Sequence, residues 1–172
     1  MSRWEKVNGF AVQSLNGYHA YLELHNNARK VFSLTGMKVL VTGGAGFIGS
    51  YLVDRLIRDG YGIRLVDNLS SGRIENIKHH LNANSVELII GDLKDPQTAL
   101  KAVGIDAVFH FAANPEVRVS ATNPEIHFNE NVVVTFNLLE ATRKKRVKEL
   151  VFASSSSVYG EPEEIPVEKT CQ

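Results

Sequence analysis

The chain has 172 residues, of which 44% are hydrophobic and 22% are charged, and its 19 basic residues balance 19 acidic ones. This size and composition suit one folded domain and exclude a disordered chain. A net charge of zero argues against a surface built for nucleic acid or anionic membranes. A single cysteine, Cys171, excludes an internal disulfide framework and a multi-cysteine metal site. The sequence has no membrane-spanning run and no secretory signal, so we expect a cytoplasmic protein.

Residues 1–36 predict no clear element. They contain the only tryptophan, Trp4, and a weak helical pattern that includes residues 21–24. Three interpretations remain open: a docking helix, a frayed tail, or upstream sequence translated from a misplaced start. A strong strand begins directly at Met37. We therefore divide the chain into an N-terminal extension of unknown role and a folded domain over residues 37–172.

From residue 37 onward, short apolar runs alternate with helical patterns. Strands are predicted over residues 38–42, 63–66, 86–90, 107–111 and 150–152. Helices are predicted from residue 47 to a stop at Gly60, and over residues 74–81, 98–102 and 124–143. Strands that alternate with helices form right-handed crossovers and a parallel sheet covered on both faces. The predicted fold class is therefore a doubly wound α/β sheet of Rossmann type, with its strands in the order 3-2-1-4-5.

The last predicted helix has recognisable ends. Asn123, Pro124 and Glu125 predict its start, because Asn caps a helix, Pro fits the first turn and an acid suits the positive end of the dipole. Basic residues 143–146 lie at its other end. They form either a solvated helix end or a nucleic-acid patch, and the negative end of the dipole favours the first interpretation.

A glycine-rich turn at residues 42–49 joins the first strand to the first helix. Gly44, Gly46 and Gly49 satisfy the G-x-G-x-x-G pattern, and Gly43 extends it. The early glycines permit a tight turn, Gly46 lets the backbone approach a pyrophosphate, and Gly49 lets the helix pack closely on the strand. The free N–H groups of the helix then face the phosphates. No Gly-Lys-Ser/Thr follows, which excludes a Walker-type phosphate loop.

An acidic residue ends the second strand at the distance that a dinucleotide site requires. Asp67 lies 18 residues after Gly49, where its carboxylate can accept hydrogen bonds from the adenosine ribose. It also favours NAD over NADP, because a carboxylate repels a 2′-phosphate, although Arg73 could soften that preference. The alternative is a glycine-rich turn beside an unrelated surface aspartate.

The third strand is followed by a second acidic residue. Asp92 and Leu93 stand where an adenine ring would lie, and Asp92 could accept a hydrogen bond from the adenine amino group. Asp92 could instead cap the helix that begins near Pro96.

The fourth strand and the long helix add further candidates. Phe111, Ala112 and Ala113 follow the strand, and the small residues let the backbone pass close to a cofactor. Asn114 is either functional or a plain turn residue. Asn131 is a poor helix former inside a predicted helix, which suggests a functional role, although a solvated Asn is the alternative.

Together these segments resemble the NAD-dependent epimerase/dehydratase family of extended short-chain dehydrogenases/reductases. The resemblance spans residues 37 to about 168 and rests on residues 42–49, 67–69, 91–93, 110–113, 131 and 154–160. Dehydratases of the family usually carry Ser/Thr-Asp-Glu before Val-Tyr-Gly, whereas this chain has serines before Val158. The resemblance is therefore strongest to the UDP-glucose 4-epimerases, or to another non-dehydratase such as a decarboxylase.

The resemblance implies an isomerase that oxidises the sugar C4 transiently through a bound NAD and needs no metal. It assigns Ser155 to the reacting hydroxyl, with Ser154 or Ser156 one position away, whereas a polar strand end is the alternative. The implied NAD contacts are Gly43, Gly46, Phe47, Ile48, Gly49, Asp67, Asn68, Asp92, Leu93, Phe111, Ala112, Ala113 and Asn131.

The chain departs from the family in one respect. The family's base is the tyrosine of Tyr-x-x-x-Lys, and no tyrosine here has a lysine four residues later; Tyr159 is followed by Glu163. The resemblance implies that this pair, and the domain for a UDP-sugar, come after residue 172. We therefore expect an N-terminal fragment, inactive alone, whose full-length form binds a UDP-sugar and forms a homodimer, one of whose helices is predicted over residues 124–143.

A second hypothesis is a non-catalytic NAD-binding module. A bare strand over residues 150–152 would be a site for aggregation or pairing. A chain selected to work at this length should cover that edge with residues 1–36 or with a partner, whereas a truncated one should be poorly soluble.

Overall fold

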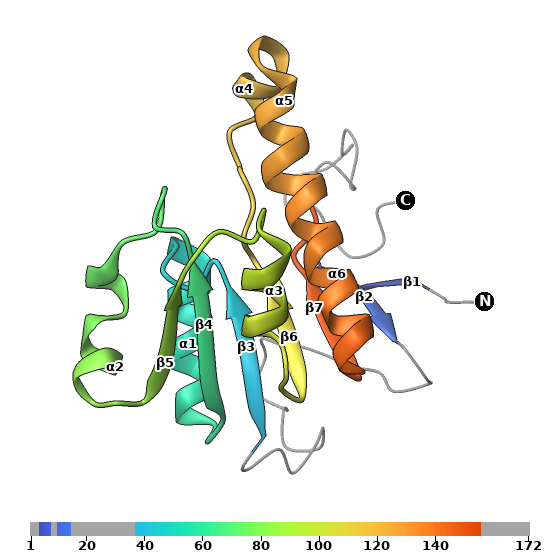
Figure 1. The fold of residues 1–172 in the computed structure, drawn as a ribbon. Coiled ribbons are helices and arrows are strands. Elements are labelled where there is room, and N and C mark those ends of the chain that lie inside the picture. The colour runs from blue at the N-terminus through green and yellow to red at the C-terminus, as the bar shows by residue number, and fades with distance from the viewer. Residues whose placement is uncertain (1–3, 8–9, 15–36, 156–172) are drawn as a thin grey trace, which may run out of the picture.

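The computed structural model describes residues 4–7, 10–14 and 37–155. They form one seven-stranded sheet with the order β1-β2-β7-β6-β3-β4-β5 (Figure 1). The strands are β1 Trp4–Val7, β2 Phe10–Ser14, β3 Lys38–Thr42, β4 Gly62–Asp67, β5 Val86–Ile90, β6 Ala107–His110 and β7 Glu149–Phe152. From β5 to β7 every pair is parallel. These five strands have the predicted order, because the second and third lie on one side of the first and the last two on the other.

The helices connect consecutive parallel strands and pack on both faces of the sheet. They are α1 Phe47–Arg58, a 3-10 turn Ile74–Asn76, α2 Lys78–Asn82, α3 Pro96–Ala102, α4 Val117–Thr122, α5 Pro124–His127, a π-helix Phe128–Val133 and α6 Val134–Lys145. None of the helices within the described ranges is long and apolar enough to cross a lipid bilayer.

Two hydrophobic cores lie on opposite faces of the sheet. Strand β3 serves both, because successive side chains of a strand point to opposite faces. Leu40 is buried with α3 and α6 residues such as Ala99 and Leu138. Val39 and Val41 are buried on the other face, with α1 residues such as Val53. The continuous apolar run of β3 is therefore the signature of a strand covered on both sides.

Helix α1 ends as the sequence predicts. Gly60 has a φ of +87°, the left-handed conformation that glycine adopts without strain. The N–H of Gly60 donates to the Ile57 carbonyl and the N–H of Tyr61 to the Leu56 carbonyl, the two bonds of a Schellman motif. The turn brings the chain back into β4.

The predicted long helix is correct in position but not in form. The segment begins with α5, widens into the π-helix and continues as α6, and the preceding α4 was not predicted. The predicted start is confirmed in position, because Asn123 is the N-cap of α5, Pro124 lies in its first turn and Glu125 is the acid there. The Asn123 side chain, however, makes no capping hydrogen bond. Glu116 is the acidic cap of this region, since its side chain accepts from the Arg118 N–H.

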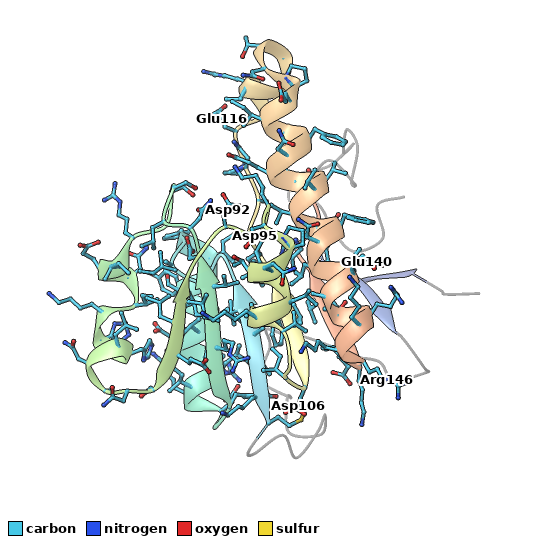
Figure 2. The ribbon with its side chains drawn as sticks, viewed as in Figure 1. Asp92, Asp95, Asp106, Glu116, Glu140 and Arg146 are labelled. Carbon is cyan, nitrogen blue, oxygen red and sulfur yellow. The ribbon has the colours of Figure 1, made fainter. Side chains whose placement is uncertain are left out.

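The basic end of α6 is a solvated helix terminus. Residues 143–146 are exposed, and Arg143 pairs with Glu140 one turn earlier, with 2.8 Å between Nη2 and Oε2. Figure 2 shows Glu140 and Arg146 along this end of the helix. These contacts favour a charged helix end over a nucleic-acid patch.

The N-terminal residues add two strands to the edge of the parallel sheet. Strand β2 pairs antiparallel with β7, from Ala11 opposite Phe152 to Ser14 opposite Glu149, and β1 pairs with β2. The edge of β7 is therefore covered from within the chain. The helical pattern of residues 21–24 lies outside the described residues.

Candidate functional site

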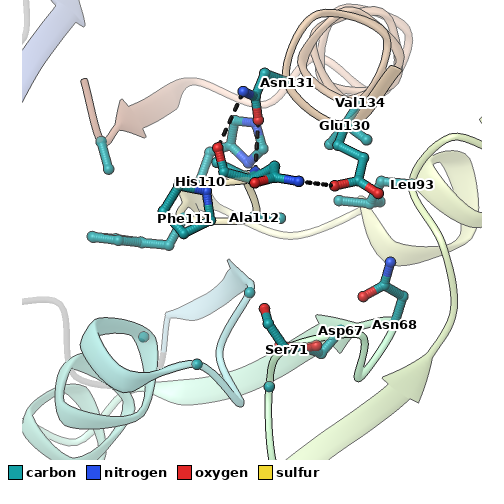
Figure 3. A pocket seen from close by; sticks show the side chains of 18 of the residues that line it. Asp67, Asn68, Ser71, Leu93, His110, Phe111, Ala112, Glu130, Asn131 and Val134 are labelled. Atoms are coloured by element: carbon teal, nitrogen blue, oxygen red, sulfur yellow. Dashed lines mark hydrogen bonds between the residues drawn. The ribbon is translucent and has the colours of Figure 1, made fainter. Parts of the chain in front are cut away.

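A cleft of about 1010 Å³ opens at the carboxyl ends of the parallel strands, where the helices that follow β3 and β6 lie on opposite faces of the sheet (Figure 3). This is the position where doubly wound sheets bind ligands, and the volume matches small-molecule sites. Every position predicted to contact a cofactor lines it, together with Ser155. They are Gly43, Gly46, Phe47, Ile48, Gly49, Asp67, Asn68, Asp92, Leu93, Phe111, Ala112, Ala113 and Asn131.

The glycine-rich turn forms one wall of the cleft and needs its glycines for steric reasons. Gly43 has a φ of +68°, and a Cβ there would lie 2.7 Å from the backbone nitrogen of Ala112. A Cβ on Gly49 would collide with the backbone of Gly43 and Gly44. The predicted close packing at Gly49 is therefore made against the turn itself, which lets α1 start directly under the loop.

The first turn of α1 presents backbone donors to the cleft. Gly46 is the N-cap and offers no side-chain cap, and the first turn carries no acidic residue. Within the described ranges, no protein group accepts a hydrogen bond from the N–H of Phe47 or Ile48. Both residues line the cleft. A 12-residue helix with open N–H groups is suited to an anion.

Asp67 is part of the loop architecture. It is 7% exposed, and its carboxylate accepts from the N–H of Ala45 at 2.9 Å and of Leu69 at 2.8 Å. The alternative of an unrelated surface aspartate is therefore wrong. Each oxygen uses one of its two lone-pair positions, so the carboxylate retains capacity for ligand hydroxyls.

Asp92 faces the same cleft from the end of β5. It accepts from the Lys94 N–H at 2.8 Å and from the Asn68 amide at 3.3 Å. Partial burial acts to raise the pKa of Asp92, but these hydrogen bonds and the Lys94 ammonium outweigh it and lower the pKa. The alternative of a helix cap is wrong, because Asp95 caps α3 by accepting from the N–H groups of Gln97 and Thr98 (Figure 2).

A buried histidine at the end of β6 was not predicted as a site residue. His110 lies between two hydroxyls, with Nδ1 2.6 Å from Thr42 Oγ1 and Nε2 3.0 Å from Thr135 Oγ1. The Thr42 oxygen already accepts from the N–H groups of Phe111 and Ala112. The Thr135 hydroxyl donates to the carbonyl of Asn131 at 2.6 Å.

These partners determine the protonation state of His110. Thr42 has one proton, which it donates to Nδ1, whereas Thr135 has given its proton away and accepts from Nε2–H. His110 is therefore neutral with its proton on Nε2. Burial lowers the pKa of His110 to about 4, in agreement with that assignment. The imidazole links the ends of β3 and β6 to the π-helix and α6.

The π-helix places polar side chains on the opposite wall (Figure 3). Asn131 Oδ1 accepts from the Asn114 N–H at 2.7 Å, and its amide nitrogen lies 3.1 Å from His127 Nδ1. The Asn114 amide in turn donates to Glu130 Oε2 at 2.7 Å. The interpretation of Asn131 as merely solvated is therefore wrong. Asn114 combines both of its suggested roles, because it lines the cleft and also accepts from the Glu116 N–H in a turn.

The last described residues close the cleft at the end of β7. Ser154 and Ser155 line it after Phe152, whose ring lies 5.5 Å from that of His110. Ser156 and Tyr159 lie outside the described residues.

The model of the NAD dependent epimerase/dehydratase family matches residues 39–172. The chain belongs to this family. The match runs from Val39 in β3 through β7, so it includes all the residues that line the cleft described above. The resemblance expected from the glycine-rich turn and the serine segment is confirmed.

Individual relatives agree with this assignment. The chain is 38% identical over 141 residues to a bifunctional UDP-glucose and UDP-xylose 4-epimerase of Pisum sativum, which covers 77% of this chain and 40% of that one. A crystal structure of a UDP-galactose 4-epimerase is 54% identical with a TM-score of 0.67, over 78% of this chain and 44% of the other. A Thermus thermophilus UDP-glucose 4-epimerase in complex with NAD is 40% identical with a TM-score of 0.69, over 78% and 43%. The chain thus spans about two fifths of the length of these relatives.

Proposed function

We propose that the cleft binds NAD, with the pyrophosphate at the start of α1. The support is steric and electrostatic at once. A Cβ built on Gly46 would have only the carbonyl oxygen of Gly43 nearby, at 3.1 Å, so that side of the turn is open. The open space lies beside the free N–H groups of Phe47 and Ile48. A phosphate there would receive backbone hydrogen bonds and the positive end of the helix dipole.

The ribose end of the cofactor fits the second strand. The Asp67 carboxylate is oriented by two backbone bonds and has acceptor capacity left, which suits the hydroxyls of an adenosine ribose. A 2′-phosphate would meet this carboxylate directly, so the site prefers NAD to NADP. The proposed remaining contacts are Asn68, Asp92 and Leu93 toward the adenine side, and Phe111, Ala112, Ala113 and Asn131 toward the nicotinamide side.

The reaction that we propose for the full-length protein is epimerisation of a UDP-sugar at C4. NAD would supply the transient hydride acceptor. In this chain, Ser155 lies on the rim of the cleft at the end of β7 and would hydrogen-bond the reacting sugar hydroxyl. The named relatives are 4-epimerases of UDP-glucose, UDP-galactose and UDP-xylose, which supports the substrate class.

The 172 residues taken alone carry Ser155 but no Tyr-x-x-x-Lys. We therefore expect them to bind NAD without converting UDP-glucose to UDP-galactose, since general acid–base catalysis contributes roughly 10²–10⁴-fold. Sensitive detection of UDP-galactose by chromatography tests this. Turnover by the purified chain would mean that another group serves as the base.

A non-catalytic NAD-binding module is the second candidate function, and one observation favours it. Strand β2 covers the edge of β7. An edge protected from within the chain lets the domain stay soluble without further strands.

A homodimer of the full-length protein is also part of the proposal. The π-helix and α6 present an exposed apolar stripe at helical spacing, with exposures of 57% for Phe128, 54% for Val132, 61% for Phe136 and 45% for Leu139. A stripe of this kind suits the corresponding stripe of a second copy.

The decisive test is calorimetric titration of NAD into the wild-type chain and into Gly46→Ala. Gly46 has a φ of −73°, which alanine adopts freely, and the one tight contact of its Cβ, 3.1 Å from the Gly43 carbonyl oxygen, is relieved by a small shift of the turn, so the variant should fold. Its methyl group would occupy the phosphate position, and we expect at least tenfold weaker binding. Gly62→Ala is the control, because its only tight contact would be with the flexible Lys38 side chain at 3.1 Å, the nearby backbone of Met37 and Lys38 lies at ordinary van der Waals distance, and the position lies away from the cleft. Equal affinity of wild type and Gly46→Ala would refute the placement of the phosphate.

A further inference from the structure

A cluster of metal-ligating side chains lies outside the cleft, between α1 and α2. Asp54 comes from the middle of α1, and His79 and His80 from the start of α2. His80 Nε2 is 2.6 Å and His79 Nε2 is 3.2 Å from the same oxygen, Asp54 Oδ1. The two imidazole rings lie 3.9 Å apart between centroids. The Nε2 atoms of both histidines thus lie beside a single carboxylate oxygen.

The ligand atoms are close enough to share one ion. All three lie within 4.8 Å of one another, and within the described ranges this is the only such group of three. Ligands of tetrahedral zinc stand about 2.0–2.1 Å from the metal, which separates them from one another by roughly 3.3 Å. The observed distance for His79 already fits this value, and His80 would have to withdraw by less than about 1 Å.

The surroundings leave room for an ion and its water. The side chain of His79 is 58% exposed and that of Asp54 29%, whereas His80 is 13% exposed and held in place. Two imidazoles and one carboxylate are a donor set for Zn²⁺ and its first-row neighbours. Mg²⁺ and Ca²⁺ prefer oxygen ligands alone.

We propose that Asp54, His79 and His80 bind one Zn²⁺ or a similar transition-metal ion, with water as the fourth ligand. None of the three lines the cleft, so the ion would take no part in the chemistry there. It would instead fasten α2 to α1. Between β4 and α2 runs the loop that folds over Asp67, where a Cβ on Gly72 would lie 2.8 Å from Asp67 Oδ1. The ion would therefore stabilise the wall of the cleft from outside.

The test is calorimetric titration of Zn²⁺ into chelator-treated protein that carries Cys171→Ser, which removes the only thiol. We expect one ion per chain, a higher melting temperature and no comparable effect of Mg²⁺. His79→Gln, His80→Gln and Asp54→Asn should each weaken binding at least tenfold. His127→Gln and Asp59→Asn are matched controls, since the first removes a histidine elsewhere and the second an exposed aspartate at the end of α1. Unchanged affinity in the three site variants would overturn the proposal.

A second measurement uses the protein without any substitution in the site, so its result does not depend on whether a site variant folds. Long-range ¹H–¹⁵N correlation spectra distinguish the two nitrogens of each imidazole. Zn²⁺ should shift the Nε2 resonances of His79 and His80 together, at one equivalent. Binding without a change at these two nitrogens would place the ion elsewhere and refute the site.

Discussion

At the scale of single residues, His110 shows how the sheet and the helix above it are joined. Its ring is buried between Thr42 and Thr135, and both of its nitrogens are used. A protonated imidazole would need to donate from Nδ1 to Thr42, whose oxygen already accepts two backbone bonds. The folded protein therefore accommodates the neutral ring and opposes the charged one.

This opposition predicts a loss of stability in acid. The pKa of His110 is lowered from 6.5 to about 4 in the folded state by burial. The unfolded chain thus binds more protons than the folded chain in that interval. The contribution of His110 to the free energy of unfolding is therefore complete above about pH 6.5 and is lost as the pH drops toward 4. The loss amounts to about 3 kcal/mol.

Urea unfolding at several pH values checks the prediction. His110→Gln, which cannot titrate, should have a shallower slope between pH 6.5 and 4 than the wild type, even if it is less stable overall. His127→Gln leaves His110 in place and should keep the wild-type slope. Parallel curves for wild type and His110→Gln would contradict the assignment.

The sequence predicts some site residues well and others not at all. Gly43 and Asp67 are visible because their roles are local: a turn after a strand, and an acid at the end of the next strand. His110 and Glu130 are not, since their side-chain partners lie at least 16 residues away along the chain. His110 meets Thr42 across 68 residues, and no spacing rule connects the two.

At the scale of elements, α1 and α6 end with the same motif but different residues. Gly60 follows α1, whereas Arg146 follows α6 with a φ of +55°. The Val147 N–H donates to the Thr142 carbonyl, as in a Schellman motif. A side chain in this conformation costs roughly 1 kcal/mol, which Arg146 bears and Gly60 does not.

Arg146→Gly should therefore stabilise the chain by less than about 1 kcal/mol, because relief of the left-handed strain is partly offset by the greater freedom of glycine in the unfolded chain. The loss of one exposed charge at the helix end offsets only part of this gain, because residues 143–145 remain. Gly60→Ala is the mirror experiment and should destabilise by a similar amount. Chemical unfolding measures both. A destabilised Arg146→Gly would show that its side chain has a stabilising role that outweighs the backbone strain.

The hairpin of β1 and β2 gives the second prediction at this scale. Removal of residues 1–14 would leave the backbone donors and acceptors of β7 without their partner. We expect the shortened protein to aggregate in size-exclusion chromatography with light scattering. Removal of residues 1–3 alone keeps both strands and serves as the control. A monodisperse shortened protein with an unchanged melting temperature would show that the edge needs no cover.

The elements that the sequence missed have a common physical cause. The five parallel strands are predictable because each is a short, mostly apolar run followed by a turn or helix signal. The pairing of β2 with β7 joins Ala11 to Phe152, and the turns around α4 depend on Asn131 holding Asn114. Contacts between such distant segments produce no periodic pattern in the sequence from which they could be predicted.

At the scale of the whole molecule, the apolar stripe on the π-helix and α6 holds four of the eight exposed large hydrophobic side chains among the described residues. Four bulky side chains on one helical face favour association. Sedimentation equilibrium of the chain with its stripe intact should show dimers at high concentration. Phe136→Glu should shift the population to monomers by at least tenfold in the dissociation constant. Arg143→Glu changes charge on the same helix and should not. Monomers throughout would remove this face from the proposed homodimer.

The π-helix also determines how α5 is rotated about the helix axis relative to α6. A turn closed over five residues holds one residue more than an α-helical turn, and each residue rotates a helix by about 100°. Deletion of Val133 would let the segment relax into a regular helix, and α5 with Asn131 would turn by that angle relative to α6. The polar face would swing out of the cleft while the apolar stripe was cut in two. A single-residue gap at this point would thus uncouple the ligand-facing and the partner-facing sides of the helix, although it removes no contact residue.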